Sequence, residues 1–173
     1  VTLSRDGQPD IYVLTIADRS LQRITNSRSI DTEPVWMPDG RSIVFTSDRA
    51  GQPQLYEVPV SGGEPSRLSF EGRYNGSASV SPDGRYVAMV HSPGGRFQIG
   101  LLDRNNRQFR VLTNGRADES PSFSPNGRMI IYATQENGRG VLAAVSQDGR
   151  VRQSLVTTRG EVREPAWPPF LNQ

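Results

Sequence analysis

Residues 80–88 read VSPDGRYVA, and the centre of this stretch is written three times in the chain. Pro-Asp-Gly-Arg occupies positions 38–41 and 82–85, and Pro-Asn-Gly-Arg occupies positions 125–128. Pro169 marks a weaker fourth place, so the prolines follow one another at intervals of 43 or 44 residues. A fixed interval of this length is the sequence signature of a repeat protein.

Three further markers follow the same interval. The tripeptide Gly-Gln-Pro stands at 7–9 and again at 51–53. Aliphatic residues recur at one position of the repeat and large apolar residues at another: Ile11, Leu55, Ile99 and Leu142, then Trp36, Val80, Phe123 and Trp167. Because these markers are independent of the proline motif, their agreement establishes the repeat.

One repeat, residues 33–75, predicts four short strands. A short apolar segment (34–36) leads into the Pro-Asp-Gly turn, and a β-branched and aromatic segment (42–47) follows it. Residues 54–60 largely alternate between apolar and polar side chains, and residues 65–70 form a more polar fourth segment. Four antiparallel strands in about 44 residues are the blade of a β-propeller. Gly and Pro interrupt every run that a helical repeat would need, and a β-sandwich does not explain the period.

We therefore predict an all-β chain, a β-propeller built from four-stranded antiparallel blades. The repeat divides it into a partial blade (1–32), three blades (33–75, 76–119 and 120–164) and the first strand of a further blade (165–173). The chain begins on the second strand of a blade and ends on a first strand, which sums to about four blades. Such offset ends can complete one blade together and cover open sheet edges.

The amino-acid composition is consistent with many short strands and disfavours some classes of function. Hydrophobic residues make up 34% of the chain, with 17 Gly and 13 Pro. All 20 basic residues are arginine, but they are scattered among acids, which disfavours nucleic-acid binding. No apolar run approaches the roughly 18 residues of a membrane span. The strand-like start at Val1 does not read as a signal peptide, and the absence of cysteine suits an oxidising compartment.

The repeated turn predicts shape rather than chemistry. Asp-Gly or Asn-Gly between two strands is the strongest short hairpin signal, and a type I′ turn needs positive φ at both central residues. A catalytic acid has no reason to recur once per blade, whereas a turn does. We therefore assign three pairs as structural turns: Asp39 and Gly40, Asp83 and Gly84, Asn126 and Gly127.

The sequence contains no convincing active site, so we predict that the chain is not an enzyme and assign no catalytic residue. His91 is the sole histidine and is predicted to lie in a solvated loop beside Ser92. No Gly-x-Ser-x-Gly elbow and no phosphate-binding loop is present. With one histidine and no cysteine, the sequence disfavours a zinc site, because such sites are built mainly from Cys and His ligands.

The residues just before each first strand form the candidate binding set. In a propeller the first strand lines the central channel, so these polar, partly acidic loops would ring one channel mouth. Propellers bind ligands at loops that converge on the axis, although such loops also serve simply to connect strands. Clustered oxygen atoms there could also hold a hard cation such as Ca²⁺, for which no ligand is assigned. The four segments are Asp31-Thr32-Glu33, Asn75-Gly76-Ser77, Asp118-Glu119-Ser120 and Val162-Arg163-Glu164.

Two ordered stretches resemble the TolB family, the periplasmic propeller proteins of the Tol–Pal system. Residues 32–39 read TEPVWMPD, and residues 45–56 read FTSDRAGQPQLY. Residues 10–14 (DIYVL) and 165–167 (PAW) are also similar to the family, so the resemblance covers essentially the whole chain. The Pro-Asp-Gly motif alone is shared with peptidase propellers, whereas the long ordered match is specific.

The resemblance implies a small N-terminal α/β domain, a six-bladed propeller and a periplasmic location in a Gram-negative bacterium. It implies binding of the peptidoglycan-associated lipoprotein Pal at the propeller, contact with TolA through the N-terminal part, and support of outer-membrane integrity and cell division. In this family group A colicins exploit the same propeller surface for import, and calcium is associated with the channel. The partner-binding residues that it carries over are Thr32 and Glu33, followed by repeat equivalence with Asn75, Gly76, Asp118 and Glu119.

The chain differs from the family in length, because 173 residues leave out the N-terminal domain and roughly two blades. We expect an open arc, a strained four-bladed closure or self-association of chains through their open blade edges. Two other functions stay open. A prolyl-oligopeptidase-like serine peptidase would carry such a propeller beside a separate hydrolase domain. A lyase or sugar-binding propeller usually needs histidine or several carboxylates on its axis.

Overall fold

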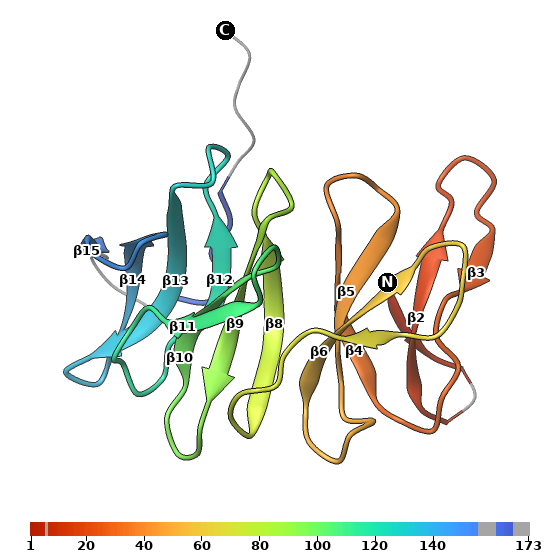
Figure 1. Ribbon diagram of the computed structural model, residues 1–173, viewed down its shortest axis with the longest axis horizontal. Coiled ribbons are helices and arrows are strands. Elements are labelled where there is room, and N and C mark those ends of the chain that lie inside the picture. The colour runs from red at the N-terminus through yellow and green to blue at the C-terminus, as the bar shows by residue number, and fades with distance from the viewer. Residues whose placement is uncertain (6, 156–161, 168–173) are drawn as a thin grey trace, which may run out of the picture.

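Short antiparallel strands make up the ordered part of the chain. The computed structural model describes residues 1–5, 7–155 and 162–167, in which fifteen strands form four sheets (Figure 1). These residues contain no helix, and therefore none that is long and apolar enough to cross a membrane. The predicted all-β architecture of blade-like sheets is confirmed.

Each sheet is a simple meander whose strands pair in chain order. The first sheet contains β1 (Thr2–Ser4), β2 (Pro9–Leu14) and β3 (Leu21–Arg23). The second contains β4 (Asp31–Trp36), β5 (Ser42–Ser47), β6 (Gln54–Pro59) and β7 (Ser66–Arg67). The third contains β8 (Tyr74–Val80), β9 (Tyr86–Ser92), β10 (Gln98–Asp103) and β11 (Gln108–Val111). The fourth contains β12 (Glu119–Phe123), β13 (Met129–Glu136), β14 (Arg139–Ser146) and β15 (Arg152–Leu155).

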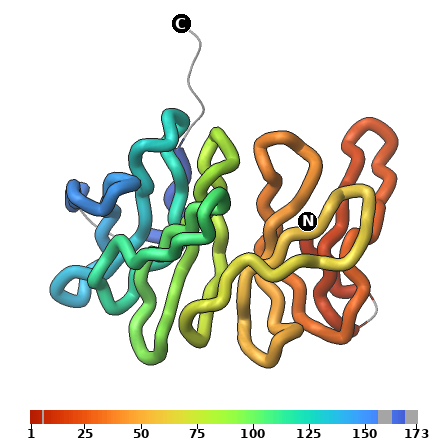
Figure 2. The backbone as a smooth tube through the Cα atoms, in the orientation of Figure 1, coloured from red at the N-terminus to blue at the C-terminus, as the bar shows by residue number. Residues whose placement is uncertain are grey.

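The four sheets stand in one row, with the first and fourth at opposite ends (Figures 1 and 2). Strands β4, β8 and β12, the first of their sheets, contact one another in succession. This arrangement is the open arc among the three expected outcomes, because the two end sheets do not close on each other. Self-association through sheet edges stays a prediction.

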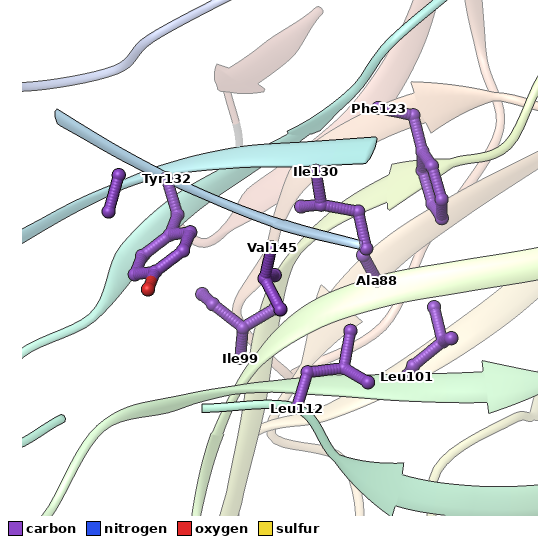
Figure 3. Close-up of a cluster of buried hydrophobic side chains, with 9 residues drawn as sticks. Ala88, Ile99, Leu101, Leu112, Phe123, Ile130, Tyr132 and Val145 are labelled. Atoms are coloured by element: carbon purple, nitrogen blue, oxygen red, sulfur yellow. The ribbon is translucent and has the colours of Figure 1, made fainter. Parts of the chain in front are cut away.

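The core lies between neighbouring sheets in three hydrophobic clusters. Ile43 and Phe45 on β5 pack toward the first sheet, while Val44 between them packs toward the third. Because both faces of a middle sheet are covered, its inner strands are apolar almost without interruption rather than alternating. Figure 3 shows the cluster between the third and fourth sheets, where Ile99 and Val145 are fully buried.

The repeated turn differs from the type I′ turn that the sequence predicts. The Gly40 amide donates to the Met37 carbonyl oxygen at 2.9 Å, which places Pro38 and Asp39 at the centre of the turn. Among the described residues Gly40 has positive φ but Asp39 does not, and no peptide bond is cis, so the turn is of type I. The prediction of type I′ is wrong because Pro38 fixes a negative φ and takes the first central position.

The Asp or Asn of each turn caps the following amide. Asp39 Oδ1 accepts from the Arg41 amide at 2.9 Å, and Asp83 and Asn126 accept equivalent bonds at 3.0 Å. The same loop also connects β14 to β15, where Asp148 Oδ1 accepts from the Arg150 amide at 3.1 Å. This fourth copy has no proline, which is why the motif in the sequence does not reveal it.

Two predicted strands are shorter or missing. The polar fourth segment of the second sheet is reduced to the two residues of β7, although the sequence suggests a strand over 65–70. Residues 165–167 are described and belong to no strand, whereas the sequence predicts a first strand there. The Trp167 amide nevertheless lies 3.3 Å from Ser122 Oγ, and its repeat equivalent, the Phe123 amide, lies 3.2 Å from Ser79 Oγ.

Candidate functional site

One position of the repeat has a left-handed backbone in all four copies. The residues are Glu33 (φ 54°), Ser77 (φ 48°), Ser120 (φ 53°) and Glu164 (φ 48°). In β4, β8 and β12 this residue sits in a β-bulge, where the pairing with the next strand shifts register. Positive φ is uncommon for residues other than glycine, and bulges re-aim side chains near functional sites. The bulge is therefore a repeated structural feature of the three first strands β4, β8 and β12.

These four left-handed residues line a single hollow of about 400 Å³, together with Tyr74, Phe97 and Glu119. We call it the mouth hollow. It lies where the first strands begin, which is the end of the sheets that the sequence assigns to a channel mouth. Five of the lining residues lie in β4, β8 and β12 rather than in separate loops as predicted: Glu33, Tyr74, Ser77, Glu119 and Ser120. Val90 comes from β9, and Phe97 immediately precedes β10.

Glu33 braces the second sheet against the third. Its Oε2 accepts from Thr46 Oγ1 and from the Ser77 amide, each at 2.7 Å, and its Oε1 accepts from Ser77 Oγ at 2.7 Å. The carboxylate thus holds the neighbouring bulge in its left-handed conformation. Glu33, which the sequence predicts as a partner contact, therefore also stabilises the backbone of the site.

Position 76 requires glycine, because neighbouring side chains occupy the space that a Cβ atom would fill. A Cβ atom there would lie 2.6 Å from the Tyr74 hydroxyl and 3.2 Å from Glu33 Oε2. The Tyr74 ring packs edge-on against Phe97, with centroids 5.5 Å apart and planes at 89°. Burial raises the pKa of the Tyr74 hydroxyl, and the negative charge of Glu33 raises it further. Tyr74 therefore stays a neutral hydrogen-bonding wall of the hollow.

Three of the six predicted contact residues are buried. Asn75 and Asp118, which are repeat equivalents, are 0% and 1% exposed, and Gly76 is buried as well. Asp118 accepts hydrogen bonds from the hydroxyls of Thr113 and Thr134, so it fastens the fourth sheet to the preceding loop. The expectation that these residues present an exposed loop is corrected, because the polar side chain at this position satisfies buried groups.

The exposed members of the predicted set are Glu33 and Glu119, and Thr32 is half-buried. Partner binding by these residues stays a prediction. The sequence does not single out Tyr74 or Phe97, because Tyr74 begins β8, Phe97 precedes β10, and no spacing signal joins them. Among the described residues no group of three or more His, Cys, Asp or Glu side chains is arranged to hold a metal ion, so calcium at the mouth also stays a prediction.

His91 lies in β9, not in the solvated loop that the sequence suggests, and is only 4% exposed. The Asn75 amide group donates to Gln54 Oε1 at 2.9 Å and to the Glu71 carbonyl at 2.6 Å, so its Oδ1 is the free acceptor. His91 Nδ1, at 2.9 Å, therefore donates to that oxygen. The imidazole thus completes a buried hydrogen-bonded group with Asn75 and Gln54.

This burial predicts an acid sensitivity. Burial lowers the pKa of His91 below its ordinary value of 6.5, against the opposing charge of Glu71. The unfolded chain therefore binds the proton more readily, and stability falls as the pH drops below about 6.5. Urea unfolding should show a lower midpoint at about pH 5.5 than at about pH 7.5.

The matched variant is His91→Thr, since Thr134 stands at the same position of the next repeat. We expect this variant to be less stable overall but to lose less stability on acidification than the unaltered chain. An equal loss in both proteins would show that His91 does not carry the effect.

Comparison with known proteins places these features in a family context. A family model described as TolB beta propeller domain matches residues 1–171. The Tol-Pal system protein TolB of Thioalkalivibrio sulfidiphilus is 70% identical over 87 residues, which are 50% of this chain and 20% of that protein. The protein of the same name from Hydrogenovibrio crunogenus is 51% identical over 103 residues, 60% of this chain and 24% of its own length.

A solved structure agrees over nearly the whole chain. The crystal structure of TolB from Acinetobacter baumannii superposes with a TM-score of 0.91 at 45% identity, covering 98% of this chain and 43% of that one. The matched segments thus span a quarter or less of these curated relatives and less than half of the solved chain.

Proposed function

The chain belongs to the TolB β-propeller family, and from this premise we propose that it is a non-catalytic, protein-binding part of a periplasmic Tol–Pal system protein. The proposed partner is the Pal lipoprotein, in support of outer-membrane integrity and cell division. TolA contact would use a domain outside these residues, and group A colicins would use the same propeller surface. The family match also argues against the peptidase alternative.

The mouth hollow is the observation that supports this proposal. Left-handed residues from four successive repeats line it, and three of them sit in β-bulges of the first strands. Hydrogen bonds from buried polar side chains support the neighbouring backbone at Asn75 and Asp118. A site whose side chains are already fixed loses little conformational entropy when a partner docks. Its acidic and aromatic side chains are suited to recognition, and the sole histidine is engaged in a structural hydrogen bond.

Charge reversal at the rim tests the proposal. Glu119→Lys combined with Glu164→Lys should weaken binding of the soluble domain of Pal by about ten-fold or more, because both side chains are exposed and line the hollow. Isothermal titration calorimetry measures the affinity. Glu33 is a poor choice for this test, since its replacement also releases Ser77.

The control is Glu64→Lys, which reverses one exposed acid in the turn between β6 and β7 and is compared with each single mouth variant, Glu119→Lys and Glu164→Lys. This turn lies at the opposite end of the sheets, because β6 runs parallel to β4 and both run away from the mouth. Equal affinities for the mouth variant, the control and the unaltered chain would refute the mouth as the Pal site.

A further inference from the structure

We propose that the mouth hollow receives an arginine side chain of the partner, with its guanidinium stacked on Phe97 and paired with Glu119 and Glu164. This inference rests on the proposed function and adds the chemistry of the contact. It follows from the charge of the lining, from the aromatic wall, and from how this protein holds its own arginines.

The charged residues that line the hollow are all acidic, although the whole chain carries 20 basic and 18 acidic residues. The carboxylates of Glu33 and Asp118 already accept hydrogen bonds from neighbouring hydroxyls. By contrast, no described residue donates to the carboxylates of Glu119 and Glu164, which are both exposed. Two unpaired acceptors on the rim leave the hollow complementary to a cation.

Phe97 supplies an apolar wall beside these acids. It is 44% exposed, and its contact with Tyr74 holds the ring in place. A guanidinium is planar and weakly hydrated, so it stacks on aromatic rings more readily than an ammonium does. An exposed ring next to unpaired carboxylates therefore favours arginine over a compact inorganic cation, which gains nothing from an apolar wall.

The protein already contains this arrangement in its own second sheet. Arg49 donates to both carboxylate oxygens of Asp31, at 3.1 and 2.9 Å, while its guanidinium carbon lies 5.3 Å from the Phe45 ring centroid and 4.9 Å from that of Tyr56. Phe70 and Tyr86 carry arginines in the same way, at 4.9 and 4.8 Å. Among the described residues no arginine stacks on Phe97, so the partner can supply one.

A small probe tests the inference without the partner protein. Nα-acetyl-arginine amide is titrated into the ¹⁵N-labelled chain, and the uncharged isostere Nα-acetyl-citrulline amide is titrated in parallel. We expect saturable shifts of the amide signals of Ser77, Phe97 and Glu119 with the arginine probe only. Phe97→Leu should weaken its binding by about two- to five-fold, the range of an exposed cation–π contact.

Matched variants separate the hollow from the rest of the surface. Glu119→Gln with Glu164→Gln should weaken the arginine probe, whereas Phe70→Leu and Glu64→Gln, which alter an exposed ring and an acid elsewhere, should leave it unchanged. Equal shifts with the citrulline probe, or shifts that require added Ca²⁺, would overturn the inference. Because Pal is absent from this experiment, such a result would leave the proposed function to its own calorimetric test.

Discussion

Phe45→Ala is expected to lower the free energy of unfolding by about 3–5 kcal/mol, the largest effect of a single change that we foresee. Phe45 is fully buried in the cluster that joins the first and second sheets, where its ring lies 6.1 Å from that of Tyr56. Removing the ring leaves a cavity that β5 cannot fill, because both of its faces are covered. The Arg49 guanidinium would also lose part of its aromatic support.

Urea unfolding followed by circular dichroism measures this change. The control is Phe70→Ala, since Phe70 is 60% exposed and its truncation should cost no more than about 0.5 kcal/mol. Similar decreases in the free energy of unfolding for Phe45→Ala and Phe70→Ala would contradict the view that packing between neighbouring sheets stabilises the fold.

Asp118→Ala is expected to cost about 2–4 kcal/mol, because it leaves the hydroxyls of Thr113 and Thr134 without their charged acceptor in a buried place. The neighbouring backbone is built around this carboxylate, since a Cβ atom on Gly115 would collide with it. Asp118 thus supports the lining of the mouth hollow through its buried hydrogen bonds, and its contact with a partner stays a prediction.

Asp118→Asn is the matched variant, because Asn75 stands at the same repeat position and satisfies its neighbours with an amide. We expect this variant to retain at least half of the lost stability in the same unfolding assay. If Asp118→Ala unfolded at the same urea concentration as the unaltered chain, the hydrogen bonds between Asp118 and the two threonines would not contribute to stability.

The period of the sequence predicts the sheets well, because each repeat must bury the same faces against its neighbours. The interval that relates Trp36 to Val80 also relates Glu33 to Ser77, so counting back from each proline motif locates the bulges. The positive φ of these residues could not be predicted, since neither Glu nor Ser favours it and the strain is offset by contacts from another sheet.

The interior of the candidate site was less accessible to sequence reasoning. Polarity alone suggested that Asn75 and Asp118 face water, yet both are buried because hydroxyls and amides from distant strands satisfy them. The sequence predicts a loop at His91 because Pro and Gly follow closely, whereas β9 extends to Ser92. Such partners are set by the packing of sheets, which local spacing does not encode.

Mapping the interface residue by residue tests the central claim most directly. The soluble domain of Pal is added to the ¹⁵N-labelled chain. The amide signals of the bulges at Glu33, Ser77 and Ser120 are compared with those of the turns at Gly40, Gly84 and Gly127. We predict that the bulge signals shift with the partner and that the turn signals, at the far ends of the first strands, do not. Shifts at the turns alone, or none at either end, would contradict a partner-binding mouth.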